Sequence, residues 1–113
     1  MGKKILRNIH PGEILGEEFL KPLGVTAYRL AKDIHVSATR VAEILSGDRS
    51  ITADTALRFS RYFGTTSKFW MGLQNDYELE EASHRVQDFS TIQKYTKSIL
   101  RLKKPLKSAR ARV

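Results

Sequence analysis

Hydrophobic residues recur every three or four positions along most of this chain, which is the spacing of one face of an α-helix. No stretch alternates apolar and polar residues between turn signals, so the pattern predicts no β-strand. We therefore expect an all-α protein. The apolar positions of the first three predicted helices are Ile14, Leu15 and Phe19, then Leu30, Ala31 and Ile34, then Val41, Ile44 and Leu45.

Turn-forming residues and helix caps divide this pattern into five helices. Pro11 suits the first position of a helix, where its missing N–H costs nothing, and Pro22 and Gly24 end that segment. Side-chain hydroxyls suited to capping an N-terminus precede each later helix, and glycines end two of them. The capping residues are Thr26, Ser37, Thr52 and Thr66, and the terminating glycines are Gly47 and Gly64.

The fourth and fifth helices, 53–63 and 67–83, carry larger side chains on their predicted inner faces. The fourth is expected to bury Ala53, Ala56, Leu57 and Phe63, and the fifth Phe69, Trp70, Leu73 and Tyr77. Aromatic residues at helical spacing most often pack in a core. We therefore interpret the second set as core or dimer contacts rather than a ligand pocket.

A weaker helical pattern continues near the C-terminus. Ile92, Tyr95, Ile99, Leu102 and Leu106 are spaced three, four, three and four residues apart. This spacing allows a sixth helix at about 91–103, although two heptads are short for a coiled coil. Pro105 should stop such a helix near Lys103, and we expect the residues after it to be disordered.

Charge separates the chain into two parts. Residues 1–89 hold 12 of the 20 Lys and Arg residues and all 12 Asp and Glu residues, so that part is formally neutral. Residues 90–113 hold the other eight cations and no acid. We therefore expect a helical domain at 1–89 and a basic extension at 90–113. The extension could be a solvated arm, an arm that binds phosphates, or a helix docked on the domain or on a second copy.

Composition limits the remaining classes of function. The 113 residues are enough for one modest core, and without cysteine there is neither a disulfide framework nor thiolate chemistry. No apolar run approaches 18 residues and no signal peptide is apparent, so we expect a cytoplasmic protein without a membrane partner. His10, His35 and His84 are far apart, and no nucleophile or phosphate-binding motif is present. The sequence therefore predicts no enzyme, cofactor or metal.

The most informative segment is 26–47, where two short helices meet at Ile34-His35-Val36. The corner of such a turn usually requires a positive φ, which favours glycine, but histidine is also enriched in that region. The second helix begins with small polar residues, as a helix that reads the major groove must. We interpret the segment as a DNA-binding helix-turn-helix with a slightly strained turn. The alternative is a helical hairpin that only packs.

Elementary chemistry assigns roles to the exposed side chains of this segment. Thr39 can bond a base edge or touch a thymine methyl group, and Arg40 can bind guanine bidentately or a phosphate. Glu43 can accept from cytosine, or it can pair with Arg40 or with the loop after Gly47. Arg49, in that loop, is placed for a phosphate contact or is a solvated charge.

Three further motifs flank this segment and relate it to a known protein family. They are His10-Pro11-Gly12-Glu13, Ile51-Thr52-Ala53-Asp54-Thr55-Ala56, and Phe69-Trp70 with Leu73-Gln74. With the helix-turn-helix between them, they resemble the HigA family of antitoxins, which are Xre-type helix-turn-helix transcription regulators. The resemblance covers about residues 8–82. His35 departs from the glycine that the family prefers, and residues beyond Ser83 match no family position.

The resemblance implies a five-helix, lambda-repressor-like domain that forms a homodimer and binds double-stranded operator DNA in its own promoter. It also implies neutralisation of a HigB-type toxin, a ribosome-dependent mRNA endoribonuclease. By position, the DNA-reading residues are Ser37, Ala38, Thr39, Arg40 and Glu43, and the phosphate-side residues are Thr26 and Tyr28.

Several alternatives stay open. The chain could be a stand-alone Xre-type regulator without a toxin, or a protein-interaction module that never touches DNA. The acidic residues near the domain's end could contact a basic toxin, or they could pair with the chain's own basic extension. These residues are Asp76, Glu78, Glu80 and Glu81.

Overall fold

The computed structural model describes residues 7–85 and 89–96, which form five helical rods followed by a short 3-10 turn. Within these residues no strand forms, and both the all-α prediction and the five-helix count are confirmed. The first rod is continuous and combines α1 (Pro11–Ile14), η2 (Leu15–Leu20) and α2 (Lys21–Leu23). The others are α3 (Ala27–Ile34), α4 (Ala38–Ser46), α5 (Ala53–Phe63) and α6 (Ser67–Arg85), and the 3-10 turn is η3 (Phe89–Thr91).

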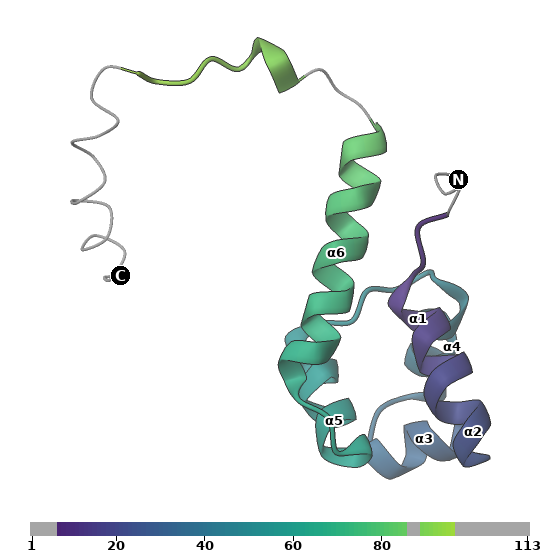
Figure 1. Cartoon of the computed structure of the whole chain (residues 1–113). Helices are drawn as coiled ribbons and strands as arrows, with labels where there is room; N and C mark the ends of the chain where they lie inside the picture. Colours follow the sequence, from purple (N-terminus) through teal and green to yellow (C-terminus); the bar gives the residue numbers. More distant parts are fainter. Residues whose placement is uncertain (1–6, 86–88, 97–113) are drawn as a thin grey trace, which may run out of the picture.

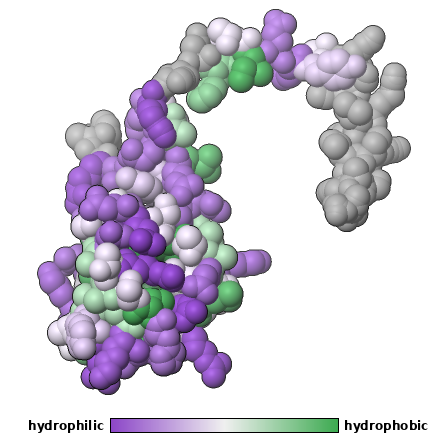
Figure 2. Space-filling model, turned by 180° about the vertical axis from the view of Figure 1, so that it is seen from behind, coloured by the Kyte–Doolittle hydropathy of each residue, from purple (hydrophilic) through white to green (hydrophobic). Residues whose placement is uncertain are grey.

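The helices form one bundle from which α6 projects (Figure 1). In it α5 packs on α6, α3 packs on α4, and α1 lies against α4. The C-terminal half of α6 extends beyond the other helices (Figure 1), and residues 78–85 are all exposed. Seen from behind, the surface of the bundle is mainly hydrophilic, with scattered hydrophobic residues (Figure 2).

The first rod contains a π-helical stretch that changes which residues face the core. The Lys21 amide bonds the carbonyl five residues earlier, on Gly16. This wider winding brings residues five apart toward one face, so both Leu15 and Leu20 are buried. The predicted inner face contains Leu15 but not Leu20, because a regular α-helix would turn Leu20 away from it.

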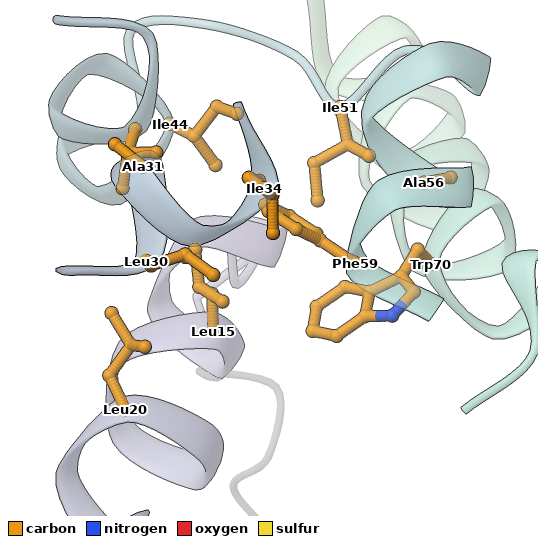
Figure 3. Close-up of a cluster of buried hydrophobic side chains, with 11 residues drawn as sticks. Leu15, Leu20, Leu30, Ala31, Ile34, Ile44, Ile51, Ala56, Phe59 and Trp70 are labelled. Carbon is orange, nitrogen blue, oxygen red and sulfur yellow. The ribbon is translucent and has the colours of Figure 1, made fainter. Parts of the chain in front are cut away.

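The core is one cluster built from every rod, and Figure 3 shows most of its members. Trp70 and Phe59 lie at its centre with no exposed surface, and their ring centroids are 5.0 Å apart. The indole N–H of Trp70 donates to the Thr65 hydroxyl over 2.8 Å, so the large ring is buried without an unpaired donor. The apolar stripe of the second predicted helix, Leu30, Ala31 and Ile34, is fully confirmed.

The inner face predicted for α5 is partly wrong. Ala53 and Leu57 are exposed, and Leu57 lines a hollow between α5 and the end of α3. The buried side instead includes Thr55 and Phe59. The hydroxyl of Thr55 lies 3.3 Å from that of Thr52, and this polar partner lets the side chain enter the interior.

Two other expectations need correction. Phe69 is 40% exposed, at the edge of the aromatic cluster rather than inside it. The sixth helix expected at about 91–103 does not form in residues 92–96, where Ile92 and Tyr95 are 72% and 60% exposed. The rest of that predicted helix lies outside the described residues. Among the described residues, no helix has the length and apolar character needed to span a membrane.

Candidate nucleic-acid interface

A helix-turn-helix occupies residues 26–47, as the sequence predicts, and its turn is built by local hydrogen bonds. The Thr26 hydroxyl accepts from the amide of Arg29, and the Ser37 hydroxyl accepts from the amide of Arg40, each over 3.0 Å. These bonds satisfy N–H groups that have no partner inside α3 and α4. The two predicted caps are therefore confirmed.

The corner of the turn is His35, at φ 61° and ψ 48°. It is the one non-glycine residue with a positive φ in residues 7–85 and 89–96. The amides of His35 and Val36 return to the last carbonyls of α3, on Lys32 and Ala31. Histidine therefore takes the left-handed conformation that glycine adopts at the ends of α4 and α5, and the positive φ expected at this corner is confirmed.

The first turn of α4 presents short side chains to solvent. Ser37, Ala38 and Thr39 are all exposed. The Thr39 side chain makes no hydrogen bond to any described residue, so its hydroxyl is available to a ligand. A helix N-terminus with small exposed residues lets a duplex approach closely, which is what reading base edges in the major groove requires.

Arg40 points toward α5 rather than straight outward. Its Nη1 lies 3.1 Å from Asp54 Oδ2 and 3.3 Å from Thr55 Oγ1. Asp54 also accepts from Arg58 Nε over 2.9 Å. These two hydrogen bonds, the one from Arg58 first, lower the pKa of Asp54, so the carboxylate stays ionised at neutral pH.

At the other end of α4, Glu43 pairs with Arg49. The Arg49 guanidinium donates from Nε to Glu43 Oε1 over 2.8 Å, and its Nη2 lies 2.7 Å from the same oxygen. Of the contacts that the sequence leaves open for Glu43, the structure therefore contains the one with the loop after Gly47. Both arginines expected at the interface lie beside a carboxylate of their own chain.

The candidate residues do not all come together. Arg49 and Glu43 touch, and Arg40 reaches α5, but no hydrogen bond or ion pair within the described residues joins Thr26 or Tyr28 to the others. Tyr28 is 69% exposed on α3. It remains a separate candidate contact.

Sequence reasoning missed two residues that build this surface, Asp54 and Arg58. Arg58 Nη1 donates to the Ile34 carbonyl over 2.7 Å, which holds the end of α3 against α5. The spacing of four residues between Asp54 and Arg58 could have indicated a helix-surface pair. Their contacts with Ile34 and Arg40 arise only in the folded chain.

The loop between α4 and α5 is fixed by a buried amide. Gln74 is 3% exposed, and its Oε1 accepts from the amide of Ile51 over 2.8 Å, while its Nε2 donates to Glu78. Two further acidic residues of α6 also have partners within the chain, since Glu80 contacts His84 and Glu81 accepts from Asn8. The bond from Ile51 to Gln74 ties α6 to the loop that follows the helix-turn-helix.

Comparison with known proteins places this geometry in a family. The family model described as helix-turn-helix matches residues 17–70. Virulence-associated protein I of Dichelobacter nodosus is 50% identical over 91 residues, which cover 80% of this chain and 84% of that protein. Antitoxin HigA-1 of Vibrio cholerae is 32% identical over 88 residues, covering 78% of this chain and 83% of that protein.

A solved structure shows the same arrangement. The Pseudomonas aeruginosa antitoxin HigA, determined with the higBA promoter, is 40% identical and superposes with a TM-score of 0.64. The match covers 97% of that chain but 72% of this one. Part of this chain therefore has no counterpart in that antitoxin.

Proposed function

Because the chain belongs to the HigA family of Xre-type helix-turn-helix regulators, we propose that it is an antitoxin that binds operator DNA and represses its own operon. The observation that carries this proposal is the exposed first turn of α4, with Ala38 and Thr39 uncovered and Ser37 capping the helix. The HigA structure with the higBA promoter supports it, since the helical domain is shared.

In this proposal α4 enters the major groove by its N-terminus. Ser37, Ala38 and Thr39 face the base edges, and Arg40 contributes its remaining N–H groups to a base or to a nearby phosphate. Glu43 holds Arg49, which contacts the phosphate backbone of the DNA near the C-terminal end of α4.

Contacts to phosphates set the orientation of the domain but carry no sequence information. We assign this role to Thr26 and Tyr28, at the N-terminal end of α3. The exposed phenol of Tyr28 can donate to a phosphate oxygen, and the N-terminus of α3 favours negative charge.

We also propose that the protein acts as a homodimer. Two copies related by a two-fold axis would place their α4 helices about 34–36 Å apart, one turn of DNA, on a palindromic operator. The partner in antitoxin activity would be a HigB-like toxin, a ribosome-dependent mRNA endoribonuclease. The similarity to antitoxins from two organisms supports this assignment.

Two experiments test the repressor and antitoxin roles separately. In the first, a reporter gene is placed behind the protein's own promoter, and we expect expression to fall when the protein is supplied. In the second, a small basic ribonuclease encoded beside this gene is induced, and we expect co-expression to restore growth. Repression without rescue would identify a stand-alone regulator, and rescue without repression would leave a protein-interaction module.

A further inference from the structure

The surface next to the candidate reading helix contains a charged chain of contacts that links three helices. Arg40 on α4 donates to Asp54 on α5, Asp54 accepts from Arg58, and Arg58 donates to the last carbonyl of α3. Each contact is 3.1 Å or shorter. We name the Arg40–Asp54–Arg58 contacts the Asp54 clamp.

The clamp fixes the direction of the Arg40 side chain. The position of Asp54 is restricted, because its Oδ2 atom also accepts a hydrogen bond from Arg58 Nε. The Nη1 atom of Arg58 is in turn bonded to the carbonyl of Ile34. Thr55, which is 2% exposed, adds a second acceptor for Arg40 Nη1. A side chain with several rotatable bonds is thereby held before any ligand arrives, which reduces the entropy that binding must overcome.

The clamp leaves one edge of the guanidinium available. Only Nη1 of Arg40 has partners among the described residues. The Nε and Nη2 atoms form the other edge, and two parallel N–H groups of that kind match guanine or a phosphate bidentately. Arg40 therefore keeps its directional donors while its charge is partly compensated by Asp54, which it shares with Arg58.

Charge compensation matters because unpaired cations attract any phosphate regardless of sequence. Arg49, in the loop after α4, is compensated by a carboxylate of its own, on Glu43. The two arginines and the shared carboxylate of the clamp therefore carry one net positive charge instead of two, and the Arg49–Glu43 pair carries none. Such an arrangement weakens non-specific attraction more than it weakens directional bonds to bases.

The geometry points to Asp54 as a specificity-determining residue, which positions Arg40 for base contact and suppresses sequence-independent binding to DNA. This inference rests on the proposed DNA-binding function. Asp54 itself need not touch the duplex, and its effect on the preference for the promoter passes through Arg40, whose side chain it positions.

The test measures affinity against salt for Asp54→Asn. The ligands are a duplex carrying the protein's own promoter and a scrambled duplex of equal length and composition. We expect tighter binding to the scrambled duplex, a slope of log affinity against log salt steeper by about 0.9, and an approximately tenfold lower preference for the promoter. Thermal melting followed by circular dichroism establishes that the variant is folded.

Glu17→Gln is the matched control. It removes the same charge from an ion pair, with Lys21 on the first rod, and neither partner makes a hydrogen bond or ion pair with a described residue of α4. We expect Glu17→Gln to leave the preference for the promoter unchanged. Asp54→Glu keeps the carboxylate and should retain the wild-type salt slope, so it also tests the inference if Asp54→Asn fails to fold.

A double-mutant comparison separates a positioning role from a general charge effect. In an Arg40→Gln background, Asp54→Asn should no longer change the preference for the promoter. The inference is overturned if Asp54→Asn behaves like Glu17→Gln, or if its effect on the preference for the promoter persists without Arg40. If the wild-type protein shows no preference for its promoter, the proposed function fails, and the specificity role of Asp54 fails with it.

Discussion

At the scale of single residues, two histidines have structural roles. The role of His35 depends on its backbone conformation, and the role of His10 depends on its protonation state. His35 occupies a left-handed corner without a glycine, at a cost of about 1–2 kcal/mol for an ordinary L-residue. His10 caps α1, where its Nδ1 accepts from the amide of Gly12 over 2.8 Å. Both roles can be tested by exchange of one side chain.

Replacing His35 tests the strain at the turn. His35→Gly relieves the left-handed strain but makes the unfolded chain more flexible, so we expect the melting temperature to stay equal or rise. His35→Val places a β-branched residue at a positive φ and should lower the melting temperature by several degrees. Each kcal/mol of lost stability corresponds to about 4–8 °C in a domain of this size. Thermal melts of the three proteins decide the matter, and equal tolerance of valine and glycine would contradict the left-handed corner.

The cap at His10 makes stability depend on pH. Partial burial lowers the pKa of His10, against the opposing influence of Glu13 and Asp48, and a protonated Nδ1 could not accept the Gly12 bond. The unfolded chain then takes up a proton near pH 6.5 before the folded chain does. Stability conferred by the neutral cap is therefore complete above about pH 6.5 and lost as the pH falls toward the lowered pKa.

Urea unfolding between about pH 7.5 and 5 measures this dependence, in a window above the ordinary pKa values of Asp and Glu. His10→Asn retains a capping side chain but does not titrate, so its stability should change less over that window. If the free energy of unfolding of His10→Asn depends on pH as strongly as that of the wild type, the cap at His10 does not titrate between about pH 7.5 and 5.

At the scale of elements, the sequence predicts the helices well and their inner faces less well. Caps such as Thr26 and Ser37 accept a hydrogen bond from an amide only three residues later, so the local sequence is enough to predict them. The burial of Leu20 depends on a π-helical stretch, and that of Thr55 on partners brought by the fold. Likewise Thr39 could be identified as an exposed candidate, whereas the contact between Arg40 and Asp54 joins residues 14 positions apart.

The crossing of α1 over α4 depends on a glycine. A Cβ atom added at Gly12 would lie 1.8 Å from the carbonyl oxygen of Ile44. Gly12→Ala must therefore push the two helices apart, and we expect a decrease of about 1–3 kcal/mol in the free energy of unfolding. Gly72→Ala, on α6 with nothing within 4 Å of the added atom, should be neutral or stabilising. Chemical denaturation of both variants checks this, and equal stabilities would contradict the close crossing.

At the scale of the whole molecule, a formally neutral domain is joined to a segment of eight cations without acids. Many of the domain's arginines are paired internally, among them Arg7, Arg29, Arg40, Arg49 and Arg58. We therefore expect a large part of the salt-dependent attraction to DNA phosphates to come from residues 90–113.

Truncation after Ser90 tests the role of this segment. Removing the eight cations should make the dependence of promoter affinity on salt shallower, by about 0.9 in slope for each phosphate that the shortened chain no longer neutralises. The melting temperature should stay within a few degrees of wild type, because Ile92 and Tyr95 are exposed and contribute little to the core. An unchanged salt slope would assign the segment no part in phosphate binding.

The central claim is that the first turn of α4 reads the protein's own operator. The most direct measurement compares the affinities of the wild type and of a Thr39→Ala, Arg40→Ala double variant for a promoter duplex and a scrambled duplex. A Glu17→Gln, Lys21→Gln variant, altered on the first rod, serves as the control. We predict that wild type and control prefer the promoter by about a thousandfold or more, and that the double variant loses most of this preference while still folding. Equal preference in the folded double variant would contradict the claim.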